Sequence, residues 1–305
     1  MTIMAVDPVV ARRAEIQQIA QGTAARRQLL SRIGVIVCRA CLVIALIPLA
    51  ALLVYVVIRG ASAWNWAFFS HLPHPAGIPG GGISNAIVGS VVIDAIAAAG
   101  AIPFGIAAGL FLAQSDGRVA GALRLAADVM SGVPSIVVAI FAYVALVSPH
   151  VGSLGHFSGV AASFAIGILM LPIIMRASET AIRAVPPVLS EAGLALGARK
   201  ATVARRIVLP TALPGLITAV LLAVARGAGE TAPLLFTAIG SQYMSWSPLK
   251  PMNVVPLVIY QNGIQAYPDI VKIAWGSALF LVVAVLALSV GSRLVAARLR
   301  RVRHD

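Results

Sequence analysis

Six long apolar runs constrain this chain more than any other feature of its sequence. Each contains at most two charged residues, and they cover residues 33–58, 83–113, 125–147, 152–175, 207–239 and 273–292. A helix that crosses a bilayer needs about 20 such residues. The sequence therefore predicts an all-α, polytopic membrane protein with six transmembrane helices.

The composition excludes other classes of protein. Apolar residues make up 60% of the 305 residues and charged residues 11%, which is too little charge to cover a protein of this size in water. The formal net charge of +13 raises the question of nucleic-acid binding. Because the basic residues lie at the ends of the apolar runs and do not alternate with aromatic residues, we expect lipid, and no nucleic acid, as a partner.

The basic residues also predict the topology. Eighteen of the 23 Lys and Arg residues fall on one side if six spans are drawn and both termini are placed inside. This asymmetry is typical of cytoplasmic segments, so we expect a cytoplasmic N-terminal tail over residues 1–30 and a basic cytoplasmic C-terminal tail over residues 298–305. The six-helix transmembrane domain would be residues 31–297. The N-terminal tail has no features of a cleaved signal, so the first span should be retained.

Residues 185–210 form the longest predicted cytoplasmic loop. Pro186 and Pro187 favour the start of a short helix, and Gly197 can end it. A second short helix should follow before Pro210 begins the fifth span. Taken alone, this pattern predicts only a helix-turn-helix on the membrane surface.

The spacing in this loop carries a resemblance. Glu191-Ala192-Gly193 is followed by Gly197 and then by Ile207-x-Leu-Pro. This resembles the EAA loop of MetI-like permeases of type I ABC importers, although Gly193 stands at the third position of the motif and Ala201 where such permeases often carry Trp. The resemblance implies a coupling helix that docks on an ATPase subunit through Glu191, Ala192, Gly193 and Gly197. No Gly-Lys-Ser/Thr sequence occurs, so the resemblance also implies that ATP is used by a partner subunit.

The fifth apolar run is longer than a bilayer requires. As one helix its 33 residues would extend about 50 Å, and Gly227, Gly229 and Pro233 predict a break. Arg226 and Glu230, four positions apart, are expected on one helical face. An arginine at membrane depth costs about 2.5–3.5 kcal/mol, so we expect it to face a cavity or a partner. A guanidinium suits phosphate oxygens, while the alternative is an ion pair that only stabilises the break.

A second resemblance is more specific than the first. Residues 225–238, which read Ala-Arg-Gly-Ala-Gly-Glu-Thr-Ala-Pro-Leu-Leu-Phe-Thr-Ala, resemble the PstA family of phosphate importer permeases, as do residues 128–136 and 176–179. The likeness extends over about residues 30–300. It implies a permease in the bacterial inner membrane that moves inorganic phosphate into the cytoplasm. Arg176 and Glu179 would join Arg226 and Glu230 in the substrate path, although Arg176 could equally be a positive-inside anchor.

The PstA-like resemblance also implies partners. These are a homologous permease of the PstC type, an ATPase dimer of the PstB type and an external phosphate-binding protein of the PstS type. We expect no catalytic residues, no metal site and no cofactor bound directly by this chain.

Other functions stay open on the sequence alone. The importer could carry another anion, or the chain could be an ion-driven anion carrier or channel in which Arg226, Glu230, Asp94 and Asp128 relay charge. A membrane enzyme is poorly supported, because no catalytic arrangement has suitable spacing. Arg124 and Asp128, four apart, predict a stabilising ion pair.

Overall fold

The computed structural model describes residues 8–75, 77–78 and 80–301 of the protein. Over these residues it contains helices and no strand, which confirms the all-α prediction. The chain divides into two compact units, Met1–Tyr55 and Val56–Asp305.

The helix α1 runs from Pro8 to Ala61 and includes the first predicted span. Its part that is apolar and long enough to cross a membrane is Arg27–Ala61. The predicted N-terminal tail is therefore helical from Pro8 onward and continuous with the span, because its sequence contains no helix-breaking residue between Pro8 and Pro48 other than two glycines. Residues 1–7 of that tail lie outside the described part of the chain.

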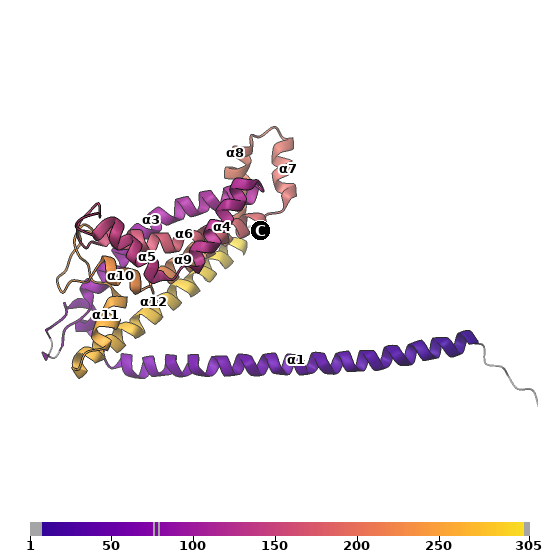
Figure 1. The fold of residues 1–305 in the computed structure, drawn as a ribbon, viewed down its shortest axis with the longest axis horizontal. Helices are drawn as coiled ribbons and strands as arrows, with labels where there is room; N and C mark the ends of the chain where they lie inside the picture. Colours follow the sequence, from indigo (N-terminus) through magenta and orange to yellow (C-terminus); the bar gives the residue numbers. More distant parts are fainter. Residues whose placement is uncertain (1–7, 76, 79, 302–305) are drawn as a thin grey trace, which may run out of the picture. The chain divides into compact units, whose positions relative to one another are not determined.

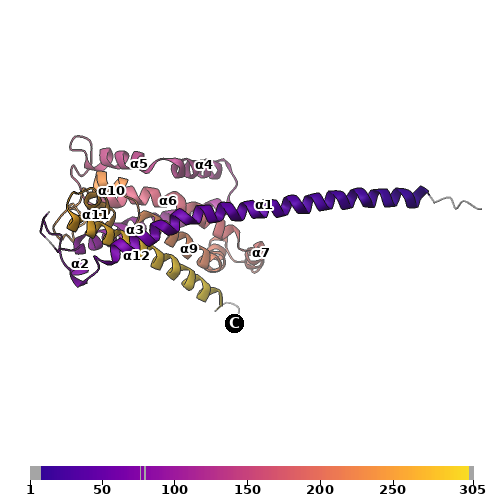
Figure 2. The same ribbon diagram turned by 90° about the horizontal axis from the view of Figure 1, so that it is seen from below.

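The second unit consists of long helices with short ones at both ends (Figures 1 and 2). The helices α3, α6, α9 and α12 run lengthwise side by side, with α7 and α8 at one end and α2, α10 and α11 at the other. The elements are α2 Trp66–Ser70, α3 Ser84–Gln114, α4 Arg118–Gly132, α5 Ser135–Ala142, the π-helix η1 Tyr143–Val147, α6 Gly159–Arg183, α7 Pro187–Ala195, α8 Lys200–Val203, the π-helix η2 Ala204–Val208, α9 Leu209–Gly227, α10 Ala232–Thr237, α11 Val255–Gly263 and α12 Pro268–Arg301. Residues 302–305 of the predicted C-terminal tail lie outside the described residues.

Among the described residues, five helical segments are long and apolar enough to span a membrane. The third predicted span, residues 125–147, falls in a pair of helical segments, Arg118–Gly132 and Ser135–Val147, that are bent by 100° relative to each other. Pro134 causes the bend, since it cannot donate a backbone hydrogen bond to the preceding turn and stands as the N-cap of α5. The prediction of six spans is confirmed if this bent pair is counted as one.

Two predicted boundaries were wrong. The fourth span starts at Gly159 and not at residue 152, because the Ser158 hydroxyl caps the helix by accepting a hydrogen bond from the Ala161 amide. It ends at Arg183, so Arg176 and Glu179 lie within the helix. Pro210 does not separate two helices either: α8, η2 and α9 form one segment, Lys200–Gly227, in which the wider π-type turn before Pro210 accommodates the proline.

Small residues let α3 and α6 approach closely. Gly105 and Gly109 of α3 form a G-x-x-x-G sequence that faces α6, which is typical of tight helix pairs in membranes. A Cβ added at Gly109 would lie 2.6 Å from the Ser178 Cβ and 2.8 Å from the Met175 carbonyl oxygen. The C-terminal end of α3 is thereby fixed against the charged end of α6.

Candidate functional site

Arg226 lies in the last turn of α9, and the helix stops one residue later at Gly227. Glu230 lies beyond this end, in the turn before α10, so the expected shared helical face was wrong, whereas the predicted break is confirmed. The Arg226 Nη2 and Glu230 Oε1 atoms are 3.7 Å apart, which is an ion pair without a hydrogen bond. The Arg226 side chain is 63% exposed, so its donors remain available to another acceptor.

Arg226 borders an open cavity of about 290 Å³. The bend between α4 and α5 also lines the cavity and contributes the two serines Ser131 and Ser135. Two of the three sequence segments that carry the phosphate-permease resemblance, one around the bend and one around Arg226, therefore meet in space. The cavity is lined by Met130, Ser131, Val133, Pro134, Ser135, Leu169, Ile173 and Arg226.

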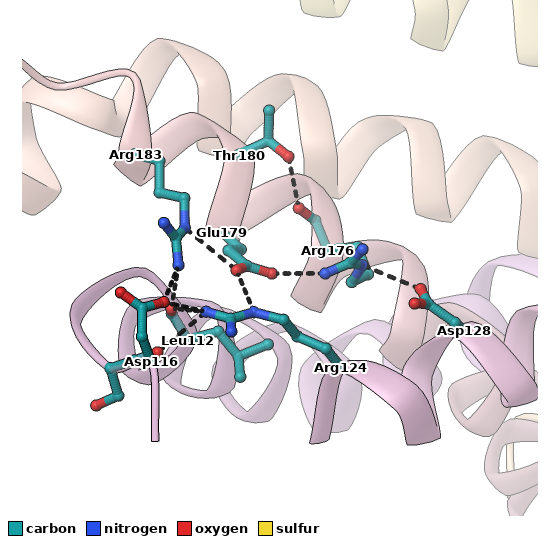
Figure 3. A network of polar contacts seen from close by, with 9 residues as sticks. Leu112, Asp116, Arg124, Asp128, Arg176, Glu179, Thr180 and Arg183 are labelled. Carbon is teal, nitrogen blue, oxygen red and sulfur yellow. Dashed lines mark hydrogen bonds and ion pairs between the residues drawn. The ribbon is translucent and has the colours of Figure 1, made fainter. Parts of the chain in front are cut away.

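Glu179 is the centre of a second charged group, near the C-terminal end of α6 (Figure 3). Its side chain is only 7% exposed. The Oε1 atom accepts hydrogen bonds from the Nε atoms of Arg124, at 2.8 Å, and Arg183, at 3.2 Å, and Oε2 accepts one from Arg176 Nη1 at 2.9 Å. These three hydrogen bonds from guanidinium groups offset the cost of burying the carboxylate.

Two of these arginines also hold the end of α3. Arg124 Nη2 donates to the Leu112 and Ser115 carbonyl oxygens at 2.7 and 3.0 Å, and Arg183 Nη2 donates to the Leu112 carbonyl at 3.1 Å. The last carbonyls of a helix have no partner within it, and cations stabilise that end. The group thus ties together α3, α4 and α6.

Asp116 completes this end of the group from the loop after α3. Its Oδ1 accepts from Arg183 Nη2 at 2.9 Å and from Arg124 Nη2 at 3.2 Å. The hydrogen bond from Arg183 and the charge of that guanidinium, together with the hydrogen bond from Arg124, hold the pKa of Asp116 below the ordinary value of a carboxyl group.

The predicted Arg124–Asp128 pair was wrong. Arg124 turns toward Glu179, and Asp128 pairs with Arg176, whose Nε atom is 3.2 Å from the Asp128 Oδ1. Arg176 and Glu179 are in contact, as are Arg226 and Glu230, but the structure gives the two pairs different surroundings. Asp94, which the sequence left without a role, lies half-buried in α3 and forms no ion pair with the residues that the structure describes.

The predicted coupling helix is α7, which starts at Pro187 as expected. Gly197 follows its end with φ of 79°, and the amides of Gly197 and Ala198 bond to the carbonyls of Leu194 and Gly193. This is a Schellman motif, in which a left-handed residue ends the helix.

The four predicted coupling residues do not share one face. Glu191, Ala192 and Gly197 are exposed, whereas Gly193 is buried. A Cβ at Gly193 would lie 2.7 Å from the Ile207 Cδ1 and 3.0 Å from the Val203 Cγ2, so this glycine seats α7 on the start of the fifth span. Gly193 is thus packed within this chain, and its coupling role stays a prediction.

Exposed apolar side chains on and beside α7 were missed in the sequence. The only signal in the sequence is that they are apolar residues in a short loop flanked by polar residues. They are Val188, Leu189, Leu194 and Leu196. The Leu196 residue is 89% exposed. Such a patch on a helix at the end of a protein is typical of an interaction surface.

Comparisons with known proteins agree with this arrangement. Residues 101–303 match the family described as binding-protein-dependent transport system inner membrane component. The chain is 33% identical over 270 residues to the phosphate transport system permease protein PstA of Yersinia pestis, covering 88% of this chain and 90% of that protein. It is 36% identical over 254 residues to PstA of Haemophilus influenzae, covering 83% and 88% of the two chains.

Solved structures show the same fold. A chain of a bacterial alginate ABC transporter superposes with a TM-score of 0.61 at 15% identity, covering 92% of this chain and 96% of that one. A chain of the MetNI methionine ABC transporter in an inward-facing conformation superposes with a TM-score of 0.56 at 19% identity, covering 71% and 94%. With its bent and broken spans, its exposed α7 and these relatives, the chain belongs to the binding-protein-dependent transport system inner membrane components and, among them, to the PstA permeases.

Proposed function

We propose that this chain is the transmembrane permease subunit of an ATP-driven importer that moves inorganic phosphate into the bacterial cytoplasm. The observation that carries the proposal is the cavity that Arg226 lines together with the serines of the α4–α5 bend. The name shared by its relatives, phosphate transport system permease, supports phosphate as the cargo.

The chemistry of the cavity suits an oxyanion. A guanidinium stays charged at every physiological pH and offers planar pairs of N–H donors that match phosphate oxygens. The Ser135 hydroxyl, which also lines the cavity, adds a neutral hydrogen-bond donor. The Ser131 hydroxyl donates to the Ala127 carbonyl at 2.8 Å and can still accept a hydrogen bond. Glu230, at 3.7 Å, weakens the attraction of Arg226 for anions without occupying its donors, which favours passage over retention.

The driving force would come from other subunits. We assign a companion permease of the PstC type, an ATPase dimer of the PstB type and an external phosphate-binding protein of the PstS type as partners. ATP would bind the ATPase, and this chain would hold no cofactor of its own. The exposed Glu191 and Ala192, together with Leu196, would dock α7 on the ATPase, so that closure of the ATPase dimer moves the spans.

The expected orientation follows from charge. The helices α7 and α8 and the C-terminal end of α12 lie at the same end of the second unit (Figure 1), and this end carries the arginines around Glu179. Positive residues of membrane proteins concentrate on the cytoplasmic side. We therefore propose that this end, and both chain termini, face the cytoplasm.

The test is uptake of radiolabelled phosphate into proteoliposomes that contain the full importer, with ATP inside and the binding protein outside. We expect ATP-dependent uptake that unlabelled phosphate suppresses and sulfate does not. Arg226→Gln should abolish uptake while leaving assembly intact, and Arg118→Gln, an exposed arginine away from the cavity, serves as the matched control. Uptake driven by a proton gradient without ATP, or suppressed equally by sulfate, would contradict the proposal.

A further inference from the structure

Arg176 has two carboxylate partners that differ in their surroundings. Glu179 lies on the same helix, is nearly buried and accepts from Nη1 at 2.9 Å. Asp128 lies on α4, has a side chain that is 58% exposed and meets Nε at 3.2 Å (Figure 3). The pair with Asp128 is the one that solvent and solutes can reach.

The charges of the group set the role of Asp128. Glu179 also bonds Arg124 and Arg183, and Asp116 bonds the same two arginines. These two carboxylates thus pair with three guanidinium groups. Asp128 supplies the third negative charge, which balances the three positive charges. Without it, the free side of Arg176 would carry an unbalanced positive charge and attract an anion.

The proposed phosphate cavity opens next to this pair. Ile173, three residues before Arg176 on α6, and Ser131, three residues after Asp128 on α4, both line the cavity at Arg226. Three residues correspond to roughly 4.5 Å along a helix and to nearly one turn. An anion that leaves the cavity toward the cytoplasmic end therefore meets the Arg176–Asp128 pair first.

We propose that Asp128 takes the place of the transported oxyanion as the partner of Arg176. It pairs with Arg176 in the empty permease, and the anion replaces it there on its way inward. The return of Asp128 to Arg176 then displaces the anion toward the cytoplasm. This inference rests on the proposed function. It assigns to α4, which contains Asp128, a role in transport in addition to lining the cavity.

The test compares two carboxylates of the same group. Initial rates of ATP-driven phosphate uptake are measured in the reconstituted full importer against phosphate concentration, normalised to the amount of assembled complex. Asp128→Asn should lower KM by about two- to five-fold, the range expected for removing one solvent-exposed ionic competitor, and should lower the maximal rate because release is slowed. Asp116→Asn, which removes a carboxylate bonded only to Arg124 and Arg183, should leave KM unchanged.

The conservative variant separates charge from shape. Asp128→Glu keeps a carboxylate in reach of Arg176 and should retain the wild-type KM. If the asparagine variant assembles poorly, Asp128→Ser removes the same charge and has the same expected KM. The inference would be overturned by an unchanged or raised KM in the charge-removing variant. It would also be overturned by an equally lowered KM in Asp128→Glu or Asp116→Asn. In either case, phosphate uptake by the wild type would still uphold the proposed function. Failure of wild-type uptake would instead overturn the function itself.

Discussion

Glu179 of α6 accepts a hydrogen bond of 2.8 Å from the Arg124 Nε of α4, a residue 55 positions earlier in the chain. This contact makes one nearly buried carboxylate the joint between α4 and α6, and Arg124 and Arg183 extend the joint to α3 by donating to the Leu112 carbonyl. Its surroundings are those of a structural centre, and the more exposed Arg176–Asp128 pair beside it is the part that a solute can reach.

Glu179→Gln should therefore destabilise the permease strongly. The amide retains the size of the side chain but leaves three guanidinium groups without their shared anion, and removing one partner of a buried ionic group costs about 3–5 kcal/mol. The thermal midpoint of the detergent-purified complex measures the loss. Glu191→Gln, the same change at an exposed position, should leave the midpoint unchanged. Equal midpoints for the two variants would contradict the structural role.

Asp116 gives the group a pH dependence with a defined sign. Its pKa is lowered in the folded state, so the ionised form stabilises the fold above the ordinary carboxyl pKa of about 3.9, and this contribution is lost as the pH falls through the lowered value. The wild type should thus unfold at a higher temperature than Asp116→Asn at pH 7, and the difference should vanish in strong acid. High salt should also reduce it, because Asp116 is exposed. A difference that grows on acidification would contradict the assignment.

Gly109 and Gly100, both in α3, should respond in opposite directions to alanine. At Gly109 the added Cβ meets the Ser178 Cβ and the Met175 backbone, which cannot move aside, so we expect a loss of about 1–3 kcal/mol. At Gly100 nothing lies within 4 Å of the added Cβ, and alanine favours the helix by up to about 1 kcal/mol. Thermal midpoints of the two variants check the prediction. A stable Gly109→Ala variant would mean that α3 and α6 are less tightly packed.

Leu196→Asp should weaken the contact with the ATPase subunit without unfolding the permease. The side chain projects into solvent next to the end of α7, so a charge there costs little in the free subunit but opposes burial in an apolar interface. Copurification of the ATPase with the tagged permease measures the effect. Ile264→Asp, a similarly exposed position beyond α11 at the opposite end of the unit, is the control and should copurify normally. Equal loss in both variants would indicate misfolding instead of a docking defect.

The sequence by itself determined the elements of this protein. Long apolar runs can only be membrane helices, since every backbone polar group in lipid must be bonded within the segment. The break near Gly227, the start of α7 at Pro187 and its end at Gly197 also follow from residue chemistry that acts over a few positions. These features were predictable because each depends on neighbours in the chain.

The tertiary structure decided which charges meet and which small residues are covered. The spacing of Arg124 and Asp128 favoured a pair within one helix, yet Arg124 reaches Glu179 because a nearly buried carboxylate gains more from a desolvated partner than a surface carboxylate does. Gly193 turned inward because Ile207 and Val203 pack against it. The cavity at Arg226 exists only where two broken helices, some 90 positions apart, bring their bends together. No local pattern encodes such contacts, because they are set by how the helices pack and not by the preferences of any one helix.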